Sequence, residues 1–461
     1  MLKRTVFPLL VAITFAILPG LSTSVGADAH DFVRGNSSGF ATGDAFHFAS
    51  ACASDFARAR PSERSSVPAV GLPATRTRGV PASRFARLRR GINLSHWFSQ
   101  SNGNDYSPTH LETHTTAADI ALIKRVGFDH VRLPIEPAPL FNPSDPGALD
   151  AEYLRRLDRA LDMILAGDLA VVVDIHPSDE FKRRLNDDDR HVEAFAAFWR
   201  ALAHHLSTRD PERVFLEVLN EPVVEDGYRW AGIQAKLVAA IRAAAPRHTI
   251  IATGHRWSGL SELLFLEPLP DANVVYNFHF YEPMEFTHQG ATWAGPHLSF
   301  FKDVPYPSSP EAVAKVSNAV ADEPARLHLS RYGEDRWDAA RIETKVAAAA
   351  LWAERHHVRL TCNEFGVYRR VAPAADRARW IQDVREALER HRIGWAMWDY
   401  AGGFAVADKT DGHAAVPDAG TVAALGLSER GRPGRSHTRS ARTVTRASHT
   451  RSHARRTISV D

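Results

Sequence analysis

Residues 214–222 have the sequence Val214-Phe215-Leu216-Glu217-Val218-Leu219-Asn220-Glu221-Pro222. This pattern predicts a buried strand that ends in a carboxylate, Glu221. A second segment of this kind, residues 358–366, ends in Asn363-Glu364-Phe365-Gly366. The C-terminal ends of the strands meet at one face of a parallel barrel, so we expect Glu221 and Glu364 to lie close together there. Such a pair can act as proton donor and as nucleophile or base, the two roles that hydrolysis of a glycosidic bond requires.

Strand-like and helix-like segments alternate around this pair. One of them, Leu169-Ala170-Val171-Val172-Val173-Asp174-Ile175, is almost continuously apolar, as expected for a strand covered on both faces. Helical patterns fit between the strands, for example from a Thr116/Asp119 capping box to Gly127. The predicted strands are residues 89–94, 129–134, 169–175, 213–219, 248–253, 273–279, 357–363 and 393–398.

Eight strands with intervening helices over about 340 residues predict an α/β fold, a (β/α)8 TIM barrel that forms a single catalytic domain. An open doubly wound sheet is the alternative. It is disfavoured because the first predicted strand is not followed by a Gly-rich phosphate-binding turn. We place the boundaries of the barrel domain at residues 86–428.

The N-terminus has the features of a secretory signal. Lys3-Arg4 precede an apolar run over residues 6–18, Pro19-Gly20 end that run, and Val25-Gly26-Ala27 fits a cleavage site with small residues. We therefore predict a signal peptide over residues 1–27 and a secreted or periplasmic protein. An uncleaved membrane anchor is the alternative, and we expect no membrane contact after cleavage.

Both extensions beyond the barrel are predicted to be disordered. Residues 28–85, the predicted linker, are rich in Ala, Ser, Arg, Gly and Pro without a sustained period. Residues 429–461 form a basic tail of low complexity. This tail either adheres to anionic surfaces or is solvated without a specific partner, and we favour the second interpretation.

Charge and cysteine content exclude some classes of protein. The net charge of +2 combines about +7 in residues 1–90, about −13 in residues 91–429 and about +8 in residues 430–461. An acidic body between basic ends argues against a nucleic-acid-binding core, and we expect a monomer. Of the two cysteines, Cys362 is predicted to be a buried small apolar residue, and a disulfide with Cys52 is not expected.

Chemically active and aromatic side chains follow almost every predicted strand, whereas the strand starts lack them. A lone histidine is usually a satisfied core or surface group, but this interpretation does not explain the repetition. The residues concerned are Asn93, Ser95, His96 and Trp97, then Arg132, His176, Asn220, Glu221, His255, Arg256, Trp257, His279, Tyr281, Glu364 and Trp398.

On these residues the chain resembles glycoside hydrolase family 5, the cellulase-containing family of retaining β-glycanases. The resemblance covers roughly residues 86–410. Asn-Glu-Pro alone is a weak signal, whereas several motifs in the family's order are a strong one. They are Asn220-Glu221-Pro222, His279-Phe280-Tyr281, Asn363-Glu364-Phe365-Gly366 and Trp398.

The resemblance implies a role for each matching residue. Glu221 matches the acid/base, and Glu364 matches the nucleophile, which must be ionised to attack. Arg132 matches an arginine whose positive charge favours the carboxylate form of the nucleophile. Tyr281 matches the tyrosine that hydrogen-bonds the nucleophile, and Asn220 matches the residue that binds the sugar 2-hydroxyl.

Other matches concern the acid/base and the substrate. His279 corresponds to the histidine near the acid/base, His176 to the strand-three histidine, and Trp398 to the aromatic floor beneath the sugar. The sequence departs from the family where Pro177-Ser178-Asp179 follows His176, which leaves the linkage preference open. Further candidate substrate-binding residues are His96, Trp97, Trp257 and Trp293, although Trp97 and Trp257 can equally pack under loops.

The segment from Tyr281 to about Glu334 is longer than a usual connection and is expected to wall a substrate cleft. No metal and no organic cofactor is expected. The pairs His204-His205 and His356-His357 do not share a helix face, so we interpret them as solvated.

The resemblance implies a secreted endo-β-1,4-glucanase (cellulase) that hydrolyses β-glucan by double displacement with two glutamates. The alternatives within enzymes are a mannanase, a xyloglucanase or a β-1,3-glucanase. Outside that class they are a catalytically silent carbohydrate-binding barrel or a surface adhesin that uses the basic tail.

Overall fold

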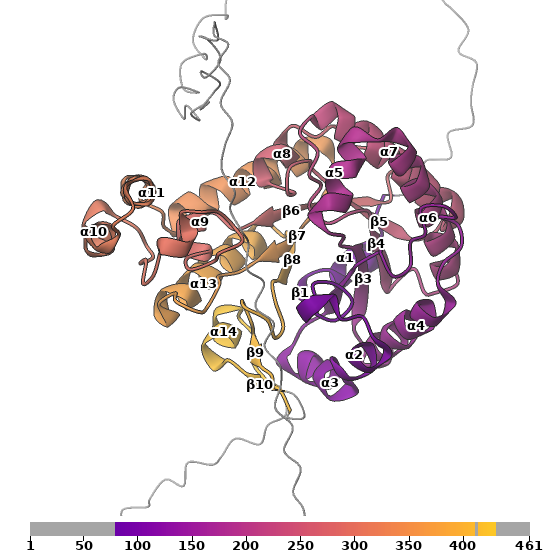
Figure 1. Ribbon diagram of the computed structural model, residues 1–461, viewed down its shortest axis with the longest axis horizontal. Coiled ribbons are helices and arrows are strands. Elements are labelled where there is room, and N and C mark those ends of the chain that lie inside the picture. Colours follow the sequence, from indigo (N-terminus) through magenta and orange to yellow (C-terminus); the bar gives the residue numbers. More distant parts are fainter. Residues whose placement is uncertain (1–78, 411–413, 430–461) are drawn as a thin grey trace, which may run out of the picture. The chain divides into compact units, whose positions relative to one another are not determined.

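The computed structural model describes residues 79–410 and 414–429. Eight parallel strands form a closed barrel in which each strand pairs with its neighbours in sequence and β8 pairs with β1 (Figure 1). The predicted (β/α)8 fold is therefore confirmed. The strands are β1 Arg90–Asn93, β2 His130–Ile135, β3 Ala170–Ile175, β4 Val214–Glu217, β5 Thr249–Thr253, β6 Val274–Phe280, β7 Arg359–Phe365 and β8 Gly394–Met397.

Helices surround the strands, and a short antiparallel pair, β9 Ala407–Asp408 and β10 Val416–Pro417, follows the barrel (Figure 1). The α-helices up to β6 are α1 Ala82–Arg87, α2 Pro108–Thr113, α3 Ala117–Val126, α4 Ala151–Ala166, α5 Asp179–Asp187, α6 Asp189–Leu206, α7 Gly227–Ala244 and α8 Leu260–Leu264. Those after β6 are α9 Met284–Thr287, α10 Pro310–Ala319, α11 Glu323–Glu334, α12 Ala339–His356, α13 Ala374–Arg390 and α14 Ala419–Ala424, with 3-10 turns η1 Asn102–Asn104 and η2 Leu298–Phe300.

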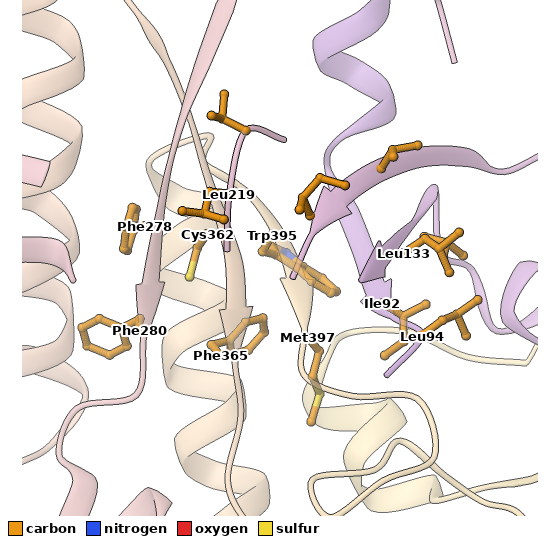
Figure 2. Close-up of a cluster of buried hydrophobic side chains, with 14 of the residues drawn as sticks. Ile92, Leu94, Leu133, Leu219, Phe278, Phe280, Cys362, Phe365, Trp395 and Met397 are labelled. Carbon is orange, nitrogen blue, oxygen red and sulfur yellow. The ribbon is translucent and has the colours of Figure 1, made fainter. Parts of the chain in front are cut away.

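Alternation along the strands divides the core into two layers. In β3, Val171 and Val173 pack in the large cluster shared with the helices, whereas Ala170 and Val172 belong to a small cluster inside the barrel. The same alternation makes Asp174 the next inward residue. Figure 2 shows part of the outer layer, with Ile92, Leu133, Phe278, Cys362, Trp395 and Met397 among its residues.

Local signals set the helix ends as predicted. The side chain of Thr116 accepts a hydrogen bond from the backbone N–H of Asp119, and the Asp119 carboxylate accepts one from the backbone N–H of Thr116. This capping box starts α3, and Gly127 ends it with a φ of +112°, a conformation that favours glycine.

The start of the domain differs from the prediction. Helix α1 begins in the last residues of the predicted linker, and Arg84 of this helix pairs with Glu212 at 2.7 Å between Nε and Oε1. Leu88, the first residue after α1, is fully buried in the cluster inside the barrel. Structure that packs against the barrel interior therefore begins before the predicted boundary at residue 86.

The remaining predictions for the ends of the chain lie outside the described residues. They are the signal peptide over residues 1–27, most of the linker, Cys52 and all but the first residue of the basic tail. Within residues 79–410 and 414–429, no helix is long and apolar enough to cross a membrane. Cys362 is fully buried, as predicted.

Strand β7 begins two residues later than predicted. Helix α12 extends to His356, and His357 caps it with a φ of +55°, so the strand starts only at Arg359. As a consequence Glu364 lies within the last residues of β7 and not after it. Its backbone is therefore held by the β6–β7 ladder, which pairs Glu364 with His279.

Candidate active site

Glu221 and Glu364 meet at the C-terminal end of the barrel. Glu221 follows β4 with a φ of +44°, an uncommon backbone conformation for a residue with a side chain. His279 Nδ1 lies 2.9 Å from Glu221 Oε1 and 3.6 Å from Glu364 Oε2. One oxygen of each carboxyl group and one ring nitrogen of His279 all lie within 4.8 Å of one another. The structure thus brings together the two carboxyl groups that the sequence singled out.

Two donors hold the Glu364 carboxyl group. Arg132 Nη1 donates to Oε1 at 2.7 Å, and the Tyr281 hydroxyl donates to Oε2 at 3.0 Å. Burial raises the pKa of Tyr281, so its hydroxyl keeps its proton and remains a donor. The contacts expected for Arg132 and Tyr281 are both present.

Burial also raises the pKa of Glu364, to about 7. The nearby His279 and the positive charge of Arg132 lower this pKa, and of these only the effect of Arg132 was expected, whereas the negative charges of Glu221 and Asp174 add to the increase. Burial outweighs the arginine, so Glu364 is not fully ionised at neutral pH. The expectation that Glu364 is ionised did not take this desolvation into account.

Arg132 contacts two further carboxylates that the sequence analysis did not select. Its Nε and Nη2 atoms donate to the two oxygens of Glu217, at 3.0 and 2.8 Å, and Nη2 lies 3.0 Å from Asp174 Oδ2. All three side chains are buried. The sequence did contain a signal for these two contacts. Glu217 and Asp174 interrupt apolar strand segments, and a carboxylate buried in a strand needs a positively charged or hydrogen-bonding partner.

His176 links this network to Asn220. Burial lowers the pKa of His176, so the ring is neutral. Its Nε2 accepts from Asn220 Nδ2 and from Gln100 Nε2, each at 3.1 Å, which leaves Nδ1–H to donate to Asp174 Oδ2 at 3.0 Å. Asn220 Oδ1 accepts from Arg132 Nη2 at 2.9 Å. The Asn220 amide therefore has a fixed orientation, which suits a residue that binds a sugar hydroxyl.

His279 is also neutral, because burial lowers its pKa to about 4. Its contact with Glu221 Oε1 is consequently a hydrogen bond with a neutral imidazole and not an ion pair. The ring lies between the two carboxyl groups and holds the Glu221 side chain, as the resemblance implied for a histidine near the acid/base.

Three of the predicted substrate-contacting residues lie beside this site. Trp398 stacks on His176 with ring centroids 5.7 Å apart and an interplanar angle of 20°. The backbone N–H of Trp257 donates to the carbonyl of Pro222 at 3.0 Å, next to Glu221, and its side chain is 48% exposed. His96 Nε2 lies 3.7 Å from the carboxylate of Asp399, the residue after Trp398.

For Trp97 the structure favours the alternative of packing under a loop over contact with substrate. Its side chain is 2% exposed, packs against Phe98, and donates its ring N–H to the carbonyl of Leu111 at 2.8 Å. Trp97 therefore joins the first βα loop to α2 as a core residue. The sequence could not decide this, because a tryptophan next to a strand end fits both roles.

Trp293 lies farther out, on the long connection between β6 and β7. It is exposed and packs edge-to-face on Tyr368 at 4.9 Å. Tyr368 contacts Phe404, and Phe404 contacts Tyr281, with ring centroids 5.6 and 6.0 Å apart. An aromatic wall thus runs from Trp293 to the catalytic centre. The connection itself is filled by helices α9, α10 and α11, and its residues Phe286, Phe301 and Tyr306 are buried.

Comparisons with known proteins agree with this geometry. The cellulase (glycosyl hydrolase family 5) family model matches residues 91–403. Endoglucanase C from Acetivibrio thermocellus is 30% identical over 319 residues, which are 68% of this chain and 91% of that protein. Cellodextrinase A from Ruminococcus flavefaciens is 28% identical over 313 residues, which are 66% of this chain and 83% of that protein.

A solved structure of Thermotoga maritima Cel5A in complex with cellobiose is similar as well. It superposes with a TM-score of 0.62 at 26% sequence identity, over 74% of this chain and 98% of that chain. The match of the family model over most of the barrel, together with the paired glutamates at its C-terminal face, gives one conclusion. The chain belongs to glycosyl hydrolase family 5 and is a glycoside hydrolase.

Proposed function

We propose that this glycoside hydrolase is a secreted endo-β-1,4-glucanase that acts by double displacement. The observation that carries the mechanism is the spacing of the two catalytic glutamates. One oxygen of Glu221 and one of Glu364 lie within 4.8 Å. Retaining enzymes need carboxyl groups about 5–5.5 Å apart, whereas inverting enzymes leave room for water with about 6.5–9.5 Å. The short gap supports attack by Glu364 itself.

In the first step, a Glu364 oxygen attacks the anomeric carbon while Glu221 gives its proton to the departing glycosidic oxygen. The bond between that carbon and oxygen breaks, and an ester bond to Glu364 forms. In the second step, the Glu221 carboxylate takes a proton from water, the water oxygen bonds to the anomeric carbon, and Glu364 is released. Tyr281 and Arg132 each hold one oxygen of Glu364 during this exchange.

Glu364 must lose its proton before it can attack the anomeric carbon. Because burial raises its pKa to about 7 in the protein without substrate, part of the population holds a proton there at neutral pH. Only the ionised form is a nucleophile, so activity is expected to increase with pH as Glu364 loses its proton. The positive charge of Arg132 favours the ionised form of Glu364 and so increases the fraction of the enzyme that can react.

The substrate class is supported by the relatives. Endoglucanase C of Acetivibrio thermocellus is named for internal cleavage of glucan, and the Thermotoga maritima enzyme has been solved with cellobiose. The latter has also been solved with mannotriose, which makes β-mannan the second candidate substrate. The residues Lys3-Arg4 and the apolar run after them support export of the chain.

A substrate panel tests this proposal. Reducing ends and solution viscosity are followed on carboxymethylcellulose, β-mannan, xyloglucan and β-1,3-glucan, with Glu364→Gln as the inactive control. We expect release of reducing ends from carboxymethylcellulose with an early fall in viscosity, as internal cleavage produces. Binding without release on every polymer would instead identify a silent carbohydrate-binding barrel, and faster release from mannan would reassign the substrate.

A further inference from the structure

A second group of metal-binding side chains lies on the long connection between β6 and β7. Glu285 belongs to α9, His297 directly precedes η2, and His328 belongs to α11. One carboxylate oxygen of Glu285 and one ring nitrogen of each histidine lie within 4.8 Å of one another. The three residues come from three separate elements, so the fold and not a local motif gathers them.

The three side chains already contact one another. The rings of His297 and His328 are stacked with centroids 3.8 Å apart and an interplanar angle of 4°. His328 Nδ1 lies 3.6 Å from Glu285 Oε1, which is longer than a normal hydrogen bond. Two stacked imidazoles repel each other if both carry a proton. In agreement with this, burial and the neighbouring His328 lower the pKa of His297.

We propose that Glu285, His297 and His328 bind one Zn²⁺ ion, with water in the remaining position. Two imidazole nitrogens and one carboxylate oxygen are donors that Zn²⁺ prefers, whereas Ca²⁺ and Mg²⁺ favour all-oxygen sites. Neutral imidazole is the ligand form, and a divalent ion removes the unfavourable contact between the rings. The side chains of Glu285 and His328 are 23% and 40% exposed, so the ion can enter from solvent.

Binding requires the rings of His297 and His328 to leave their stacked arrangement, because a metal ion lies in the plane of each imidazole that binds it and two parallel rings cannot both point at one ion. Zinc–ligand distances of about 2.0–2.2 Å place tetrahedral ligand atoms about 3.3–3.5 Å apart. The present separations of up to 4.8 Å must therefore close by up to roughly 1.5 Å. Rotation of the three partly exposed side chains about their own bonds would supply both movements.

The ion would tie the outer helices to the catalytic tyrosine. Helix α9 carries Glu285 and also Thr287, whose hydroxyl donates to the backbone carbonyl of Tyr281. The backbone N–H of Tyr368, a residue of the aromatic wall, donates to the carbonyl of Thr287 at 2.8 Å. Zinc would thus fix α11 and the His297 segment to the short helix that supports Tyr281, and its main effect would be on thermal stability.

Equilibrium dialysis and thermal melting of the full chain with ZnCl₂ test the proposal. The test variants are His297→Gln and His328→Gln. The control is His204→Gln, which removes an exposed histidine elsewhere and so accounts for zinc bound by any of the other histidines among the 23 of the chain. Wild type and His204→Gln should each bind one more equivalent of zinc than His297→Gln and His328→Gln do. Their Tm should increase by roughly 5 °C when free zinc exceeds the Kd about 1,000-fold.

Cobalt supplies a readout that does not depend on stability. Co²⁺ bound to two imidazoles, a carboxylate and water should give a visible absorption band in wild type that both cluster variants lack. Glu221→Gln distinguishes this site from the catalytic cluster, because it should leave zinc stoichiometry unchanged. The proposal is overturned if His297→Gln and His328→Gln bind zinc like wild type, or if Glu221→Gln abolishes binding.

Discussion

Arg132 Nη1 lies 2.7 Å from Glu364 Oε1 inside the barrel, and neither side chain is more than 5% exposed. The same guanidinium also contacts Glu217 and Asp174, so one positive charge faces three buried carboxyl groups. Burial raises the pKa of Asp174 to about 7, as it does for Glu364. The site therefore retains protons at a pH where exposed carboxyl groups have lost them.

Because these carboxyl groups are buried, the stability of the protein should depend on pH, and the direction of the change can be predicted for Glu364. The pKa of Glu364 is higher in the folded protein than the value of about 4.3 expected in the unfolded chain. Between about pH 4.3 and 7 the folded state binds the proton more tightly, so the contribution of this group to the free energy of unfolding falls as pH rises. Glu364→Gln cannot ionise and should lack this loss.

Urea denaturation at pH 5 and pH 8 measures the effect. The free energy of unfolding of Glu364→Gln, relative to wild type, should increase between these two pH values by up to roughly 3 kcal/mol. The same variant should lose turnover by several orders of magnitude. A relative stability that is independent of pH would show that Glu364 titrates at an ordinary pKa.

Glu221 should reveal its role through the leaving group. Glu221→Gln removes the proton donor, so natural β-glucan, which has a poor leaving group, should lose most of its kcat/KM. An activated aryl glycoside should be affected much less, because its leaving group departs without protonation. The ratio of the two losses is measured under conditions where formation of the glycosyl-enzyme limits both substrates, and equal losses would remove the acid role from Glu221.

Much of the fold was predictable because strands and helices each leave a local pattern of apolar residues in the sequence. The near-continuous apolar run of β3 and the capping box of α3 are local signals, and both elements form where expected. The paired glutamates were also predictable, since both follow or end apolar runs and a closed parallel barrel must bring such ends together.

Features that depend on the interior of the barrel were not predictable from local pattern. The pKa of Glu364 depends on how deeply the site is buried and on Asp174, whose position toward Arg132 follows from the closed ring of strands. The convergence of Glu285, His297 and His328 depends on the packing of a 53-residue stretch, from residue 282 to residue 334, that has no repeating signal. In both cases the partners are far apart in sequence.

Trp97 and Trp257 provide a matched test of core against substrate-facing aromatic residues. Trp97→Ala should lower the free energy of unfolding by about 3–5 kcal/mol, because the ring is buried and its N–H is bonded. Trp257→Ala should change it by less than about 0.5 kcal/mol but raise the KM for polymer, because the ring is half exposed beside the Glu221 loop. Urea melts and initial rates measure the two effects. A stable Trp97→Ala with a raised KM would reverse the assignment.

The stability of the barrel should depend on where the chain begins. A chain beginning at Gly79 and ending at Glu429 should keep the activity of the full mature protein, because it contains every described element. A chain beginning at Arg89 loses α1 and Leu88, and should be less stable by at least about 3 kcal/mol. Thermal melts of the two chains compare these values. Equal melting temperatures would mean that α1 and Leu88 do not stabilise the barrel.

The stereochemistry of the first product is the most direct test of the catalytic geometry. One oxygen of Glu221 and one of Glu364 lie within 4.8 Å, which is closer to the spacing of about 5–5.5 Å in retaining enzymes than to the wider gap that leaves room for water. In the proposed double displacement, Glu364 bonds to the anomeric carbon and the second displacement restores the original configuration. Proton NMR of the nascent product from a soluble β-glucan should show the β-anomer first. A 2-fluoro glycoside should label Glu364 in wild type, and the Glu364→Gln variant should remain unlabelled. Early appearance of the α-anomer would instead mean inversion, with Glu364 acting as a base on water and a wider gap in the working enzyme.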